Sequence, residues 1–223
     1  MVFAGVVSCI SSVWAFATAA EPLAFDGSWK EVGFLRLSSN DYRQTGTGLG
    51  ISSDGTVSLL WKPLDKSHWD ATQATWSWRV SQGVVPTDLT KKGGDDRNLA
   101  LYFIFVDRAR ADTLRTSNAR RVLREDSTRA IIYVWGGDHA VGQDLASPYS
   151  PRMRTKILQV AMTGSFDESI DLAQDYRRLF GTAPGALVGV ALSADSDDTD
   201  GRIVANLSDL TLRKPAQADS SAP

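Results

Sequence analysis

Residues 99–107 read LALYFIFVD, a run in which almost every position is apolar. Successive side chains of a β-strand point to opposite faces of the sheet, so one strand normally shows only one set of alternate positions to a core. When both sets are apolar, both faces are covered. We therefore expect residues 99–107 to form a central strand of a β-sheet.

Other apolar or alternating runs lie on both sides of this strand, and turn sequences rich in glycine and aspartate separate them. Such spacing favours antiparallel strands joined by tight turns. The pair Asp54-Gly55 is the clearest hairpin signal, and the alternation over 202–210 predicts a strand near a sheet edge. With 99–107, eight runs fit an all-β, mostly antiparallel β-sandwich. The other seven predicted strands are 29–37, 56–63, 74–80, 130–136, 155–162, 186–195 and 202–213.

One helix is predicted in the segment GSFDESIDLAQDYRRLFGTAP, residues 164–184. Ser165 and Glu168 have the spacing of a capping box, and Gly181 suits the left-handed position that ends a helix. Its apolar residues fall on one face, so we expect the helix to pack on the edge or end of a sheet. These apolar residues are Ile170, Ala173, Tyr176, Leu179 and Phe180.

The arginine-rich connection 108–126 is longer than an ordinary loop. We interpret it as a solvated excursion between strands that has its own structure or is mobile. The alternative is a flap that binds anions or a membrane surface.

The first twenty residues contain no charged side chain and end in small residues, which is typical of an export signal. We therefore predict a signal peptide at 1–20, one domain at 21–213 and a disordered tail at 214–223. The protein would be periplasmic or secreted, with no transmembrane segment in the mature chain. Cys9, the only cysteine, lies in the leader, and its lipidation stays open. A mature chain without cysteine has no disulfide and no cysteine-based metal site.

The net charge argues against one class of partner. A formal charge of −2 in 223 residues does not provide the positive field that binding to a phosphate backbone requires. Nucleic acid is therefore excluded as a partner.

Several motifs, taken in order, resemble a known family. They are ATWSWRV (74–80), KKGGDDRNLALYFIF (91–105), IIYVWG (131–136), SPYSPRMRTKILQV (147–160), AQDYRRLFG (173–181) and GVALSADSDDTDGRIVANLSDL (189–210). They resemble the bacterial family of exported proteins catalogued as domain of unknown function 3047. The resemblance implies a β-sandwich, similar to the jelly-roll modules that often bind sugars. With the helix expected within residues 164–184, the predicted fold is a jelly-roll-like β-sandwich with one packed α-helix. The resemblance implies no particular activity.

The acidic stretch DSDDTDG, residues 195–201, is the first candidate site. An EF-hand is excluded, because neither register places both glycine and glutamate where that loop requires them. A looser oxygen cage for Ca²⁺ remains, with Asp195 and Asp197 as candidate ligands. The alternative is a plain turn, because Asp, Ser, Thr and Gly are common in turns. Calcium is the only cofactor that the sequence suggests.

The second candidate site is GGDD, residues 93–96. In an extended segment Asp95 and Asp96 point to opposite faces, so they cannot form one carboxylate dyad. We expect each to bind backbone N–H groups or an arginine at the start of the strand. Alternatively, one of them forms a catalytic pair with Asp88 or Asp195, at the separation of the two carboxylates in a glycosidase.

Tryptophans give the third candidate site. Trp76 and Trp78 share one strand face with small apolar residues and are predicted to be core, which leaves Ser77 and Arg79 to line a groove. Trp61 and Trp69 lie in a turn-rich polar stretch, where we expect exposed indoles that bind a ligand.

Together these observations favour an exported, non-catalytic binding module whose ligand is a glycan or another small polar molecule. Two alternatives stay open: a polysaccharide hydrolase that uses an aspartate pair, and a structural or accessory envelope protein with a protein partner. No catalytic residue and no oligomeric state is assigned. Neither His68 nor His139 has the spacing of a catalytic base or a zinc ligand. The predicted ligand-binding residues are Trp61, Trp69, Ser77, Arg79, Asp95 and Asp96.

Overall fold

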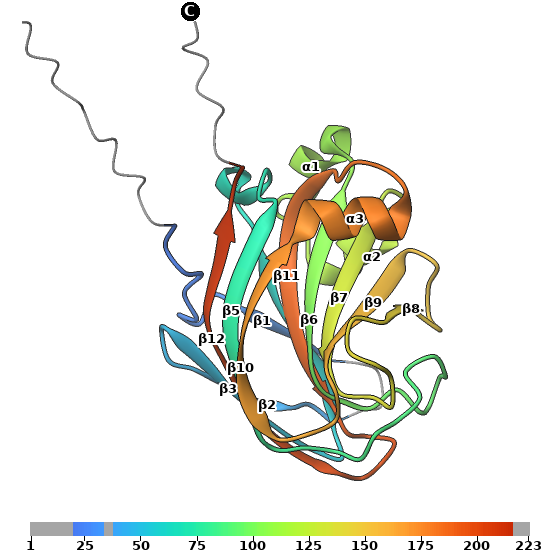
Figure 1. The fold of residues 1–223 in the computed structure, drawn as a ribbon. Helices are drawn as coiled ribbons and strands as arrows, with labels where there is room; N and C mark the ends of the chain where they lie inside the picture. Colours follow the sequence, from blue (N-terminus) through green and yellow to red (C-terminus); the bar gives the residue numbers. More distant parts are fainter. Residues whose placement is uncertain (1–19, 34–37, 216–223) are drawn as a thin grey trace, which may run out of the picture.

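The chain folds into two β-sheets packed face to face (Figure 1). The computed structural model describes residues 20–33 and 38–215. The predicted leader and tail lie almost entirely outside these ranges. Within them, no helix is long and apolar enough to cross a membrane.

The larger sheet has seven strands in the described residues, and β6 is at its centre, as predicted from its two apolar faces. Neighbouring strands are antiparallel except for the parallel pair β7 and β9. In spatial order the strands are β1 (Lys30–Gly33), β4 (Val57–Pro63), β11 (Ala186–Asp195), β6 (Arg97–Val106), β7 (Arg129–Trp135), β9 (Met153–Gln159) and β8 (Asp144–Ala146).

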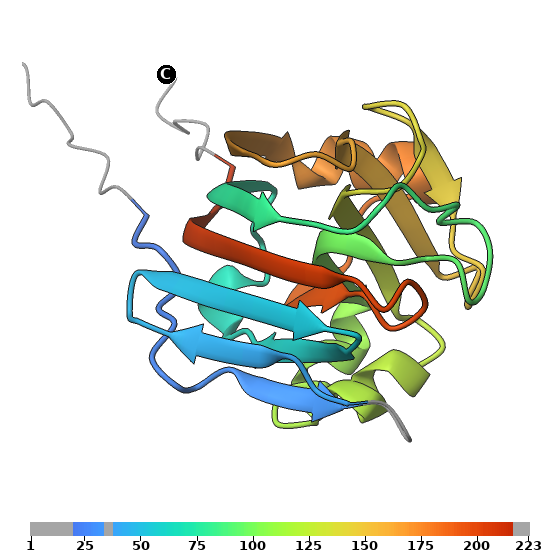
Figure 2. The ribbon, with the colours of Figure 1, turned by 90° about the horizontal axis from the view of Figure 1, so that it is seen from below.

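The smaller sheet has five antiparallel strands in the same described residues. Figure 2 shows β2, β3, β12 and β5 side by side although they come from distant parts of the chain. In spatial order the strands are β10 (Gly164–Asp171), β5 (Gln73–Gln82), β12 (Arg202–Arg213), β3 (Gly48–Asp54) and β2 (Asp41–Gln44). Two mainly antiparallel sheets confirm the predicted all-β, jelly-roll-like sandwich.

Two predictions about the arrangement of the strands are wrong: one concerns a hairpin and the other the position of a strand in its sheet. Asp54-Gly55 does not close a hairpin, because β3 belongs to the smaller sheet and β4 to the larger one. Gly55 still adopts the positive φ of 57° that the turn requires. The strand over 202–210 is not near an edge: β12 is the middle strand of its sheet, and it alternates because its outer face meets solvent.

The predicted helix begins later than its capping-box pattern indicates. Residues 164–171 form β10, which pairs with β5 along its whole length, and α3 (Leu172–Phe180) follows. The side chain of Asp171, not that of Ser165, caps the helix by accepting a hydrogen bond from the backbone N–H of Gln174 at 2.8 Å. The helix ends at Gly181 with a φ of 74°, as predicted. It covers one end of the sandwich (Figure 1).

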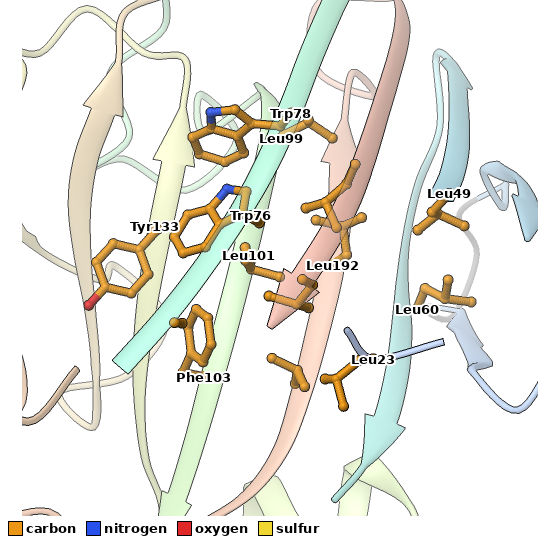
Figure 3. Packing of buried hydrophobic residues seen from close by; sticks show 14 of the residues in the cluster. Leu23, Leu49, Leu60, Trp76, Trp78, Leu99, Leu101, Phe103, Tyr133 and Leu192 are labelled. Carbon is orange, nitrogen blue, oxygen red and sulfur yellow. The ribbon is translucent and has the colours of Figure 1, made fainter. Parts of the chain in front are cut away.

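Trp76 and Trp78 are core residues, as predicted, and are 2% and 1% exposed. Trp76 packs between the rings of Phe103 and Tyr133, with ring centroids 6.0 and 5.8 Å away (Figure 3). These contacts join β5 of one sheet to β6 and β7 of the other, so burial of aromatic surface holds the layers together.

The arginine-rich connection forms α1 (Arg108–Leu114) and α2 (Ala119–Arg124), so it does have its own structure. Its apolar residues Ala111, Leu114, Ala119 and Val122 are buried against the outer face of the larger sheet. A 3₁₀ turn, η1 (Lys66–His68), precedes β5 near the same end. The outer face of the larger sheet is thus partly covered, which limits where a ligand can reach it.

The close approach of Gly189 to Trp61 on that face leads to a prediction about stability. A Cβ added at Gly189 of β11 would lie 1.9 Å from the buried ring of Trp61. We expect Gly189→Ala to lower the free energy of unfolding by about 1–3 kcal/mol, because the ring or the strand must move. Urea denaturation measures this. Gly33→Ala is the control, since its Cβ would make only an ordinary 3.6 Å contact; equal losses in both variants would contradict the packing.

Candidate functional site

A pocket of about 60 Å³ opens on the outer face of the larger sheet. Strands β6, β7 and β9 form its base, and the loops around residues 89–95 and 147–149 form its sides. One part of its lining is polar and the other apolar. The lining residues are Leu89, Asp95, Arg97, Tyr102, Ile132, Val134, Ser147, Pro148, Tyr149, Met153 and Thr155.

Arg97 is the charged centre of this pocket, and its side chain is only 13% exposed. Its Nη1 donates to the backbone O of Asp95 at 2.7 Å and to Oδ2 of Asp195 at 2.9 Å. A longer contact of 3.3 Å reaches Oδ2 of Asp95. Its Nη2 donates to the hydroxyl of Tyr102 at 2.8 Å. The guanidinium therefore fixes two carboxylates and one phenol around a single point.

An irregular register places Arg97 in this position. Ser193 of β11 pairs with Ala100 of β6, whereas Asp195 pairs with Arg97, so β6 has one extra residue between the two pairs. Strand irregularities of this kind change the direction of a side chain. As a result Arg97 contacts Tyr102, although an odd spacing of five residues would place the two on opposite faces of a regular strand.

Tyr149 borders the pocket and is 55% exposed. Its hydroxyl donates to Oδ1 of Asp95 at 2.7 Å, which fixes the end of the side chain. The ammonium of Lys92 lies 5.6 Å from the ring centroid. Burial and the hydrogen bond to Asp95 raise the pKa of Tyr149, so its hydroxyl stays protonated and donates at neutral pH.

Asp195 lies behind the pocket and is 6% exposed. Burial raises its pKa, and the neighbouring carboxylates of Asp197 and Asp96 act in the same direction, while the ion pair with Arg97 opposes them. Burial disfavours the charge of Arg97, but Tyr102, Asp195 and Asp95 outweigh this and raise its pKa. Arg97 therefore stays charged at any physiological pH.

Asp96 belongs to a different cluster from Asp95, as the sequence predicts. It is fully buried, and its Oδ2 accepts hydrogen bonds from the backbone N and the Oγ1 of Thr199 at 2.8 and 2.6 Å. Asp95 instead contacts Arg97 and Tyr149. Both predicted structural roles are confirmed: one aspartate binds backbone N–H groups and the other pairs with an arginine.

Two groups of side chains in the described residues have the proximity that a metal ion requires. One consists of Asp96, Asp197 and Asp198, whose oxygens lie within 4.8 Å of one another. The other consists of Asp88, Asp138 and His139. In that group Nε2 of His139 already accepts a hydrogen bond from the backbone N–H of Leu89 at 3.1 Å, so it serves the loop.

The prediction that the indoles of Trp61 and Trp69 are exposed is wrong, since they are 4% and 6% exposed. Both pack in the cluster between the larger sheet and α1. The polar segment around them turns outward through η1, and Nε1 of Trp69 donates to the carbonyl of Leu64 at 3.0 Å. Neither indole is available to stack on a ligand.

Ser77 and Arg79 lie on the outer face of the smaller sheet, opposite the tryptophans, as the alternation predicts. Ser77 donates to Oδ1 of Asp167 on β10 at 2.5 Å, and Arg79 is exposed. They are therefore on the other side of the sandwich from Asp95. The structure does not bring all the predicted ligand-binding residues together.

Sequence reasoning missed three residues of the pocket: Arg97, Tyr102 and Tyr149. Arg97 directly follows the two aspartates of GGDD, so its position next to them was a usable signal. Tyr149, in SPYSP, comes from a segment more than fifty residues away, and only the fold brings it to Asp95.

Comparison with solved structures finds matches at low sequence identity. The xyloglucanase domain of NopAA, a type three effector from Sinorhizobium fredii in complex with cellobiose, is 8% identical with a TM-score of 0.45, covering 83% of this chain and 92% of that one. A family 12 glycoside hydrolase is 12% identical with a TM-score of 0.49, covering 87% and 96%. The family 11 xylanase from Neocallimastix patriciarum is 12% identical with a TM-score of 0.40, covering 83% and 99%.

No curated protein matches the chain. A family model does match, over residues 27–211, which is most of the sequence and includes both sheets and the pocket. The chain therefore belongs to the family described as protein of unknown function DUF3047.

Proposed function

We propose that the protein is a non-catalytic binding module that holds part of a saccharide in the Arg97 pocket, outside the cytoplasm. The observation that carries this proposal is the position of Tyr149. The residue is more than half exposed at the edge of the pocket, while its hydroxyl is fixed to Asp95. The leader-like residues 1–20 support the location.

The chemistry of the lining suits a hydroxylated ligand. A sugar ring has an apolar face and a rim of hydroxyls, and an exposed tyrosine ring offers a rigid apolar surface to such a face. Asp95 provides acceptors, Arg97 provides donors, and Thr155 can do either. These three side chains reach the pocket from one sheet and the loop before it.

The size of the pocket defines how much of a ligand it holds. A volume of about 60 Å³ has room for a few water molecules, or for one edge of a sugar ring. The rest of the ligand would lie outside the pocket, over Tyr149. We therefore propose that the site binds one end or one residue of a glycan.

Binding is better supported than hydrolysis. Asp95 and Asp195 both contact Nη1 of Arg97, which is the observation that favours a catalytic pair. A catalytic carboxyl must reach the scissile bond, however, and Asp195 is buried and absent from the pocket lining. Asp95 alone faces a bound ligand.

The test is a glycan array followed by calorimetry on the purified protein. We expect Tyr149→Ala to weaken saccharide binding about 10-fold or more, because it removes the apolar surface. Tyr149→Phe should lose less, since the ring remains.

Arg79→Ala, on the opposite sheet, is the control and should bind as the wild type does. Loss of binding in Arg79→Ala alone would move the site to the smaller sheet. Absence of saccharide binding in the wild type would contradict the proposal. Release of reducing sugar, abolished by Asp95→Asn and by Asp195→Asn, would replace binding with hydrolysis.

A further inference from the structure

The arginine-rich segment 108–126, which forms α1 and α2, carries positive charge that nothing in the described residues neutralises. It contains six arginines and three acidic side chains. The ion pairs of the segment are Lys66 with Asp112, Arg108 with Asp70, Arg110 with Glu125, and Arg152 with Asp126. All three acids are thus used, whereas Arg115, Arg120, Arg121 and Arg124 pair with no carboxylate in the part of the chain that the structure describes.

Three of these four arginines lie together on the outer side of α2. Successive residues of an α-helix are about 100° apart around its axis. Because Ala119 and Val122 are buried against the sheet, Arg120, Arg121 and Arg124 lie on the opposite side, and all three are exposed. Arg120 and Arg124 are one turn apart, a spacing at which like charges repel each other, so an anion over this α2 surface would be stabilising.

Contacts with neutral groups hold α2 in place. Nη2 of Arg120 donates to the carbonyl of Gly33 on β1 at 2.8 Å. Arg152, at the start of β9, donates to the carbonyls of Leu123 and Glu125 at 3.2 and 2.8 Å, which fixes the end of the helix. Because carbonyls carry no net charge, these bonds position the α2 surface and leave it positive.

The α2 surface adjoins the Arg97 pocket. The apolar cluster beneath α1 and α2 shares two residues, Tyr102 and Met153, with the apolar cluster beside the pocket. Both of these residues also line the pocket. Arg152, which binds the end of α2, directly precedes Met153. A glycan with one end in the pocket can therefore extend over α2.

We propose that the glycan is acidic, and that the α2 surface binds its carboxylates outside the pocket through Arg121 and Arg124. This inference rests on the saccharide-binding function proposed above. A guanidinium is a planar fork that binds a carboxylate through two parallel hydrogen bonds, and every cation of segment 108–126 is an arginine. Inside the pocket Asp95 disfavours a second carboxylate, so the acidic groups belong outside it.

An anionic membrane surface has similar charge, but the two helices do not suit it. Helices that bind a membrane surface bury an apolar face in the bilayer. The apolar side chains of α1 and α2 face the sheet instead, and Leu123, at 37% exposure, is the one large apolar side chain that these helices expose. Docking through α2 would also turn the pocket toward the lipid. An acidic glycan therefore fits this face better.

Calorimetry on the purified full chain tests the charge of the ligand. Hyaluronan, polygalacturonate and alginate are each compared with their own carboxyl-reduced form, which keeps the backbone of the glycan and removes its charge. At about 20 mM NaCl we expect at least one acidic form to bind about 10-fold more tightly than its reduced form. At about 500 mM NaCl this advantage should disappear, because salt screens exposed charges.

Variants then locate the effect. The double variant Arg121→Gln/Arg124→Gln changes only exposed side chains, so it should fold and should bind the acidic form no more tightly than the reduced form. Lysine at both positions keeps the charge but not the fork, and should lose part of the advantage. Arg43→Gln/Arg79→Gln is the matched control, because it removes two exposed arginines from the smaller sheet, and it should bind as the wild type does.

The outcomes separate this inference from the saccharide proposal. Equal affinity for the acidic and reduced forms would overturn the acidic class and leave saccharide binding in the pocket intact. Equal losses in the α2 variant and the control would also overturn it. Acidic binding that is lost in the α2 variant but kept in Tyr149→Ala would support the α2 surface and contradict the pocket. Binding to vesicles of phosphatidylglycerol and phosphatidylcholine, without binding to any acidic glycan, would assign the surface to a membrane instead.

Discussion

Replacement of Arg97 by leucine should lower the free energy of unfolding by about 3–5 kcal/mol, one of the two largest effects that we expect from a single change. The variant would leave the carboxylates of Asp95 and Asp195, with side chains only 12% and 9% exposed, without their cation. It would also remove the donor to Tyr102. Removing one partner of a buried ion pair costs far more than the intact pair contributes, because the remaining charge stays desolvated.

Urea denaturation followed by tryptophan fluorescence measures this loss. Arg79→Leu makes the same chemical change on the exposed face of the smaller sheet and should change the free energy of unfolding by about 0.5 kcal/mol or less. If Arg97→Leu does not fold, Arg97→Lys keeps the charge but not the planar fork, and it should lose an intermediate amount. A loss below about 1 kcal/mol in Arg97→Leu would mean that the two carboxylates do not depend on Arg97.

The second large effect concerns the buried carboxylate that attaches α3 to the larger sheet. Asp175 accepts hydrogen bonds from the hydroxyl of Tyr133 at 2.9 Å, from Nζ of Lys156 at 3.0 Å and from Nη2 of Arg178 at 2.7 Å. Its side chain is 6% exposed. We expect Asp175→Asn to lower the free energy of unfolding by about 3 kcal/mol, because Lys156 would lose its charged partner in a largely buried position.

Asp167→Asn is the matched control, because Asp167 is an exposed aspartate of β10 that accepts a hydrogen bond from Ser77. It should change stability by about 0.5 kcal/mol or less. Chemical denaturation of both variants gives the comparison. Similar losses at the two positions would show that the contacts of Asp175 add little beyond those of a surface carboxylate.

The strand pattern of this chain could be predicted in large part. The runs over 186–195 and 202–213 coincide with β11 and β12, and the two apolar faces of 99–107 correctly indicate a central strand. The alternation of apolar and polar residues is visible within a short segment of sequence, so strands of this kind can be predicted without knowing the rest of the fold. By contrast, β10 was mistaken for helix, because its capping-box spacing also occurs by chance in an alternating polar strand.

The pocket was harder to predict, because its residues meet across long sequence separations. Asp95 and Tyr149 are 54 residues apart, and Arg97 and Asp195 are 98 apart. Composition suggested that aromatic and acidic side chains bind a ligand, but it assigned the aromatic role to Trp61 and Trp69. Those indoles became core because α1 and α2 cover the face on which they lie.

Local periodicity and turn chemistry thus determined the β-sandwich, its central strand and the buried faces of Trp76 and Trp78, because alternation and glycine placement act over a few neighbouring residues. Tertiary pairing determined the site. The register slip between β6 and β11 turns Arg97 toward Tyr102, and the crossing from β11 to β12 brings Asp197 to Asp96. Both depend on how distant strands align, and alignment is set by packing of the whole core, which no short segment specifies.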